Sequence, residues 1–216
     1  FMFILMLAYC FNMIDMFLLS YGWILVFQYN VLCLTFKDLK HENKRLTEND
    51  IGHMDVNIEL KNVLYDQLKL FLKMKSYYKC SRLIVLANTV FCSSIIITMT
   101  FTFIVTFSSS ELSSVFYLVK IASTDLYVCF QIYLYCKLFE NLNNKKDSVN
   151  FSIYSSDWTN MNLKSKKLLL LAMNMNNVNW LQMKASPRRH VDLQQFLNVL
   201  TTCYNIISVM VNTLKK

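Results

Sequence analysis

Residues 191–216, VDLQQFLNVLTTCYNIISVMVNTLKK, combine a long apolar pattern with a regular row of amides and hydroxyls. At 100° per residue, these polar side chains fall within an arc of about 120° on one side of a helix. The row consists of Gln194, Asn198, Thr201, Thr202, Asn205, Ser208 and Asn212. A one-sided polar row on a membrane helix needs water or a hydrogen-bonding neighbour, because lipid offers neither. Uncharged dipoles beside water would let cations pass with weak selectivity.

Two interpretations of this polar row are open from the sequence. In the first, the row faces a water-filled pore. The residues assigned to the pore lining are Asn198, Thr201, Asn205, Ser208 and Asn212. In the second, the row packs on a neighbouring helix, and apolar residues such as Ile207 and Val211 form a hydrophobic gate.

No enzyme site is predicted. The chain has no Gly-rich phosphate loop, no HExxH, no GxSxG and no clustered carboxylates. His41, His53 and His190 are far apart and lack metal-ligand spacing, and the seven cysteines include no CxxC pair. We therefore expect no catalytic residue, no metal site and no cofactor.

The composition favours a membrane protein. Of 216 residues, 55% are hydrophobic and 17% are charged, whereas a soluble domain carries about 25% charge. Two Gly and one Pro are too few for a turn-rich all-β fold. The formal charge of +8 comes from basic residues that flank apolar runs and do not form one patch, so no nucleic-acid partner is predicted.

Four stretches are long and apolar enough to cross a bilayer, which takes about 20 helical residues. They are residues 1–36, 83–107, 114–138 and 191–214. Helix is the default because it satisfies its own backbone groups in lipid. The predicted fold is therefore all-α, an integral membrane bundle with four spans and additional cytoplasmic helices.

Basic residues alternate with these spans. Residues 37–82 hold ten Lys and Arg, residues 137–189 hold nine, and the short connection 108–113 holds none. The positive-inside rule therefore places 37–82 and 139–190 in the cytoplasm and 108–113 outside. The C-terminus is then extracellular. The sequon at Asn150 would lie inside, where it goes unused.

Both cytoplasmic segments are predicted to be part loop and part helix. In the first, residues 41–55 indicate a loop, and the apolar spacing from residue 60 to residue 72 predicts a helix that runs into the second span. In the second, residues 141–158 have loop character, and residues 163–183 predict a helix packed on its neighbours. Pro187 separates this helix from the last span.

Two carboxylates, Asp15 and Asp125, lie within predicted spans. A carboxylate near the bilayer centre costs about 2.5–3.5 kcal/mol on insertion scales. Both side chains are therefore expected to face protein or water.

Several short motifs in the C-terminal third occur together. They are Tyr154-Ser-Ser-Asp-Trp158, the cluster Lys164, Lys166 and Lys167 before four leucines, Lys184-Ala185, and the series Val191, Phe196, Val199-Leu200 and Cys203-Tyr204. With the Tyr135-Cys136 pair at the end of the third span, they resemble the insect odorant receptor family. Phe139 and Asn205 depart from that family, which often has Gly and an aromatic residue there. The resemblance is specific over residues 127–216 and covers the first 126 residues by pattern alone.

The resemblance implies a seven-span receptor of the plasma membrane with an extracellular C-terminus. Members are odorant-gated, non-selective cation channels that assemble as tetramers with a shared co-receptor. The implied partners are therefore a co-receptor subunit in a hetero-tetramer, a small volatile ligand and the lipid bilayer. The four spans here would be the fourth to seventh, the last would line the pore, and the chain is interpreted as a C-terminal fragment.

The same resemblance suggests two further sets of site residues. An apolar ligand pocket in the outer half of the bundle would include Tyr9, Met13, Met16, Phe116 and Tyr117, whose aromatic and thioether groups suit volatile molecules. The alternative for each residue is lipid contact or core packing. Tyr154, Trp158 and the helix 163–183 match the part that packs subunits together below the membrane, with a purely intrachain core as the alternative.

Other classes of receptor and carrier fit less well. A gustatory-type receptor channel usually has a Thr-Tyr pair followed by Gln-Phe in its last span, but here Cys203 separates Thr202 from Tyr204. A seven-span G-protein-coupled receptor requires a cytoplasmic C-terminus, which the charge pattern opposes. A transporter would show repeat symmetry between its halves, and none is evident. The sequence leaves open which odorant binds, the subunit stoichiometry and which face of the last helix lines the pore.

Overall fold

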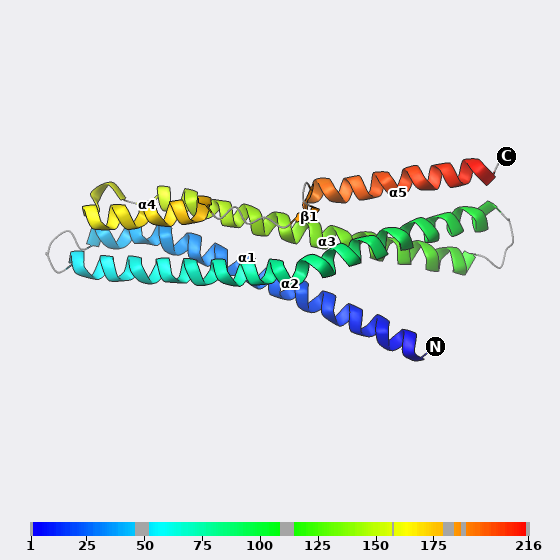
Figure 1. Ribbon diagram of the computed structural model, residues 1–216, viewed down its shortest axis with the longest axis horizontal. Helices are drawn as coiled ribbons and strands as arrows, with labels where there is room; N and C mark the ends of the chain where they lie inside the picture. Colours follow the sequence, from blue (N-terminus) through cyan, green and yellow to red (C-terminus); the bar gives the residue numbers. More distant parts are fainter. Residues whose placement is uncertain are drawn as a thin grey trace. The chain divides into compact units, whose positions relative to one another are not determined.

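The computed structural model describes residues 2–45, 52–108, 115–156, 158–178, 184–186 and 189–214. Nearly all of these residues are helical (Figure 1). The elements are α1 (Met2–Arg45), α2 (Gly52–Ser108), α3 (Val115–Tyr154), the 3-10 turn η2 (Trp158–Asn160), α4 (Leu163–Val178), β1 (Lys184–Ser186), β2 (Arg189–His190) and α5 (Leu193–Leu214). The two short strands pair as an antiparallel hairpin, with Lys184 opposite His190.

Four helices are long and apolar enough to cross a membrane, which confirms the expected all-α membrane fold with four spans. The qualifying stretches lie in α1, α2, α3 and α5, at Tyr9–Asp38, Ile58–Phe107, Val115–Tyr154 and Leu193–Thr213. Large apolar side chains such as Leu83, Phe91 and Leu126 are exposed on these helices, as expected where a helix faces lipid.

Three helices are much longer than a bilayer is thick. α1, α2 and α3 have 44, 57 and 40 residues, or about 66, 85 and 60 Å measured along the helix, whereas a span needs about 30 Å. The expected helix that leads into the second span is therefore confirmed as the first half of α2. The loop expected over residues 41–55 is wrong at both ends, because α1 continues to Arg45 and α2 begins at Gly52. Residues 46–51 lie outside the described residues.

The loop expected over 141–158 is wrong for most of its length, because α3 continues without a break to Tyr154. Leu138, Leu142, Val149 and Ile153 recur at helical spacing and are fully or almost fully buried. Most of the polar residues between them are half-buried or exposed, although Lys146 and Ser152 are buried beside the stripe. This buried stripe explains why a segment of polar composition is helical here.

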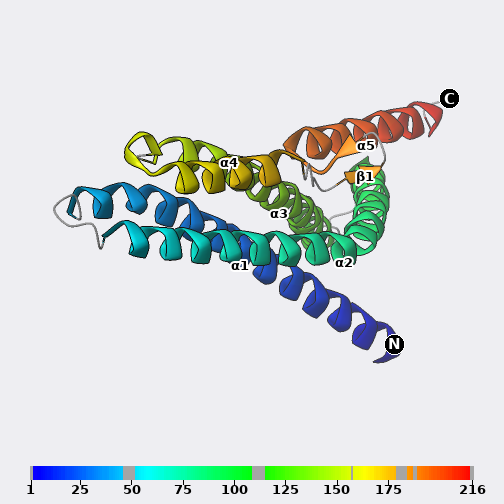
Figure 2. The same ribbon diagram turned by 60° about the vertical axis from the view of Figure 1, so that its left-hand side comes forward.

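The chain forms two compact units, and the first contains Phe1–Lys79 and Asn141–Gln182. In this unit the second half of α1, the first half of α2, the second half of α3 and α4 lie side by side (Figures 1 and 2). Each of these helices contributes fully buried apolar residues to the core. Examples are Phe36, Leu60, Met74, Leu142 and Ala172.

Side-chain hydrogen bonds tie the helices of the first unit together. The Tyr77 hydroxyl donates to the Leu18 carbonyl at 2.9 Å, and the Tyr78 hydroxyl donates to Asn143 Oδ1 at 2.9 Å. The ammonium group of Lys145 donates to Asn30 Oδ1 at 2.9 Å. These bonds join α1 to α2, α2 to α3 and α3 to α1, so the apolar core is held by polar contacts on several sides.

The second unit contains Cys80–Glu140 and Met183–Lys216. The second half of α2 packs beside the first half of α3, where the Thr100 hydroxyl donates to Asp125 Oδ2 at 2.9 Å. Asp125 is half-buried, and in the first unit Asp15 is buried, so both carboxylates face protein as expected. The expected break at Pro187 falls outside the described residues, but α4 ends at Val178 and α5 begins at Leu193, after the hairpin.

Candidate functional site

The last helix, α5, has two unlike faces. Phe196 packs edge-on against Tyr133 with ring centroids 5.8 Å apart, and the Cys203 thiol lies 3.8 Å from the Ser93 carbonyl. Cys203 and Ile207 are buried in the second unit. With Asn198 at 0°, Phe196, Cys203 and Ile207 project at about 160°, 140° and 180°. The packed face of α5 is therefore opposite the polar row.

The polar row is on the exposed side of α5. Six of its members are exposed and one is half-buried; the exposed ones are Gln194, Asn198, Thr201, Thr202, Asn205 and Asn212, and the half-buried one is Ser208. Of the two gate candidates of the second interpretation, Ile207 is buried in the packed face and Val211 is half-buried. The second unit thus leaves the row free of packing by its own helices.

Local hydrogen bonds fix the start of α5 and the hydroxyls of the row. Asp192 caps the helix, since its Oδ1 accepts a bond of 2.8 Å from the Gln195 amide. The Thr201 and Thr202 hydroxyls donate to the carbonyls of Leu197 and Asn198, at 2.9 and 2.7 Å. Because these hydroxyls already donate within the helix, only their oxygen lone pairs remain for a further hydrogen bond.

One apolar side chain interrupts the polar row. Val209 projects at about 20°, inside the arc, and is 64% exposed. Leu197 borders the arc at about 260° and is also exposed. The exposed surface of α5 therefore consists of a polar row with one apolar side chain within it and another at its border.

The five residues expected to bind a ligand are all exposed. Tyr9, Met13 and Met16 lie on α1 in the first unit, and Phe116 and Tyr117 lie near the start of α3 in the second unit. The three residues on α1 are not among the lining of the described hollows around Trp158, Lys69 and Gln67. Their assignment as pocket residues therefore stays a prediction.

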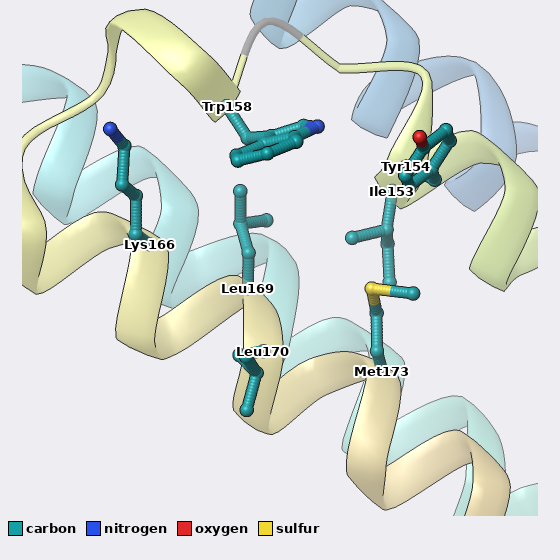
Figure 3. A pocket seen from close by; sticks show the side chains of 7 residues that line it. All are labelled: Ile153, Tyr154, Trp158, Lys166, Leu169, Leu170 and Met173. Atoms are coloured by element: carbon teal, nitrogen blue, oxygen red, sulfur yellow. The ribbon is translucent and has the colours of Figure 1, made fainter.

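The two residues expected at a subunit interface lie together. The rings of Tyr154, at the end of α3, and Trp158, in η2, have centroids 6.4 Å apart. They line an apolar groove of about 220 Å³ with five other side chains (Figure 3). The others are Ile153, Lys166, Leu169, Leu170 and Met173. We call this feature the Tyr154–Trp158 groove.

The groove is built by α4 and the turn that precedes it. Asn162 caps α4, because its Oδ1 accepts a bond of 2.8 Å from the Ser165 amide. The Lys166 ammonium donates to the Thr159 carbonyl at 2.8 Å and holds the η2 turn over the helix. Figure 3 shows Leu169 and Met173 reaching from α4 toward Trp158 and Ile153. A partner could place apolar side chains here, since the walls are almost wholly apolar.

A third feature, a cluster of hydrogen-bonded amide side chains between α3 and α4, was not anticipated from the sequence. Asn176 Nδ2 donates to the Lys146 carbonyl at 3.1 Å and to Asn150 Oδ1 at 3.0 Å. Asn150 Nδ2 in turn donates to Asn177 Oδ1 at 2.6 Å. The Asn-rich stretch in 174–179 was the available signal, but it indicated only a broken apolar body. Both polar side-chain atoms of Asn150, the first residue of the sequon, are therefore in hydrogen bonds within this cluster.

Comparison with known proteins identifies the family. Among curated proteins, none matches the chain. The family model described as 7tm Odorant receptor matches residues 1–204, which include α1 to α4 and the first half of α5. The match extends to the N-terminal half, where the sequence motifs are less specific. The chain therefore belongs to the 7tm Odorant receptor family, a family of receptors and not of enzymes.

Proposed function

We propose that this chain is a subunit of an odorant-gated, non-selective cation channel of the plasma membrane, and that α5 contributes its polar row to the ion pathway. The carrying observation is that the row lies opposite the face by which α5 packs in the second unit. In lipid, the amides of Asn205 and Asn212 and the remaining acceptor sites of the hydroxyls would have no water as a hydrogen-bond partner. Water in a pore supplies those partners.

The chemistry of the row suits weakly selective cation passage. Exposed hydroxyl and amide groups, such as those of Thr201, Asn205 and Asn212, offer dipoles without a fixed charge. Val209, exposed within the row, would add an apolar constriction. The competing interpretation, in which Ile207 forms the gate, is less favourable because Ile207 is buried in the second unit.

Cysteine accessibility tests the orientation of α5. In the full-length receptor, co-expressed with the co-receptor and freed of its exposed native cysteines, Asn198→Cys, Asn205→Cys and Asn212→Cys should react with water-soluble thiol reagents and change the current. The controls are Leu200→Cys and Met210→Cys, which project at about 200° and 120°, toward the packed face. If the control cysteines react and the cysteines in the polar row do not change the current, the pore lies on another face of α5.

We further propose that the inner membrane boundary on α1 lies near Gln28 and not at residue 36. Within the first unit, Gln28 of α1 and Lys69 and Lys73 of α2 line the same hollow of about 230 Å³. Lys145 also bonds to Asn30 of α1. The ammonium groups of Lys69, Lys73 and Lys145 would each cost about 2.5–3.5 kcal/mol inside a bilayer. The lower part of α1 would then belong to a cytoplasmic bundle.

The ligand and partner assignments complete the proposal. An odorant would contact Tyr9, Met13, Met16, Phe116 and Tyr117, because exposed aromatic and thioether side chains offer dispersion contacts to small volatile molecules. The Tyr154–Trp158 groove would take part in assembly with the co-receptor in a hetero-tetramer. Its apolar walls and exposed aromatic rings support this role.

A further inference from the structure

We infer that the first unit binds one structural water between Tyr29 of α1 and Gln67 of α2. Tyr29 is 2% exposed and Gln67 is 6% exposed. Among the described residues, Tyr29 Oη and Gln67 Oε1 are both buried polar atoms without a hydrogen-bond partner. Both side chains line the same small hollow, with Phe71, Met175 and Asn176. Two buried polar groups beside one hollow form a site for a small polar ligand.

The hydrogen-bonding directions of the two groups are complementary to water. Gln67 Nε2 donates to the Ala172 carbonyl at 3.3 Å, and a carbonyl can only accept, so this bond fixes the orientation of the amide. Gln67 Oε1 is therefore the acceptor that remains for the hollow. The Tyr29 hydroxyl is able to donate. A water molecule can accept from Tyr29 and donate to Gln67 at the same time.

The size of the hollow selects the ligand. It leaves about 10 Å³ for the centre of a water molecule. One water needs about 10–15 Å³ by this measure together with at least two polar partners. This space suits one water molecule and no larger ligand, and Phe71, Met175 and Asn176 line the rest of the hollow.

The bound water would complete a link across three helices. Tyr29 on α1 reaches the water, the water reaches Gln67 on α2, and Gln67 reaches the Ala172 carbonyl on α4. Without the water, the inner surfaces of α1 and α2 would each keep a buried polar group unsatisfied.

A double-mutant cycle tests this site in the full-length receptor assembled with its co-receptor. Tyr29→Phe removes the donor, and Gln67→Leu removes the acceptor together with the bond to α4. Each single variant should lower the thermal unfolding midpoint of the assembled receptor. The double variant should fall by clearly less than the two shifts added, because both partners serve the same water. Additive shifts would overturn the proposal.

A density map that resolves ordered waters gives an independent test. The expected result is a peak within about 2.6–3.2 Å of both Tyr29 Oη and Gln67 Oε1, which disappears in the double variant. A direct bond between Tyr29 and Gln67, or a side chain that fills the hollow, would refute the water site. Tyr77→Phe, which removes the bond to the Leu18 carbonyl about three helical turns away from Tyr29, is the matched control and should leave the peak in place.

Discussion

The Tyr154–Trp158 groove gives a quantitative test of how this chain meets a neighbouring subunit. Tyr154 is 64% exposed and Trp158 is 39% exposed. With side chains of roughly 200 and 250 Å², about 130 Å² of Tyr154 and about 100 Å² of Trp158 are open to a partner. At about 25 cal/mol per Å², full coverage of Tyr154 would contribute about 3 kcal/mol to association. Tyr154→Ala should therefore weaken binding by up to roughly 100-fold.

The assay is the association of the full-length receptor with its co-receptor, measured by titration in detergent or nanodiscs. Phe151→Ala is the matched control, because Phe151 lies on the same helix and is 68% exposed but does not line the groove. Ile153→Ala serves as a stability control, since Ile153 is almost fully buried and its loss should lower the melting temperature of the chain itself. Tyr154→Ala should leave that temperature close to the parent value.

The outcome that refutes the assignment is specific. If Tyr154→Ala and Phe151→Ala weaken association equally, the loss does not depend on the groove. If neither variant changes association, the groove is not an interface with the co-receptor. Only a loss confined to Tyr154→Ala, with unchanged melting, supports the groove as the docking surface.

Three further predictions concern stability, topology and assembly. Leu142→Ala, at a fully buried position, should lower the free energy of unfolding by about 2–5 kcal/mol, and a melting temperature equal to the parent would contradict the helical reading of this segment. A tag after Lys216 should be reachable from outside intact cells and a tag within residues 42–55 should not. Asn150 should carry no glycan, because the proposed orientation places it in the cytoplasm. Reversed labelling or a glycan would exclude that orientation. The 216 residues alone should give no odour-evoked current, which should require a full-length chain and the co-receptor, and a robust current from this chain by itself would count against the proposed assembly.

The sequence by itself determined the class of the protein. Spans can be found from composition because lipid demands an unbroken apolar helix, and this requirement is local in the chain. The polar row on the last helix could be recognised for the same reason, since helical geometry fixes which residues share a face. Motifs such as Tyr154-Ser-Ser-Asp-Trp158 indicated the family that the comparison then confirmed.

Only the tertiary structure decided what each helix face contacts. The segment after residue 140 was expected to be a loop, because its polar composition hid a buried stripe that includes Leu142 and Val149. The packed face of α5, marked by Cys203 and Ile207, and the pairing of Tyr29 with Gln67 around one hollow depend on contacts between residues far apart in the chain. Such contacts are set by the complementary shapes of several helices at once, and no periodicity within one helix contains that information.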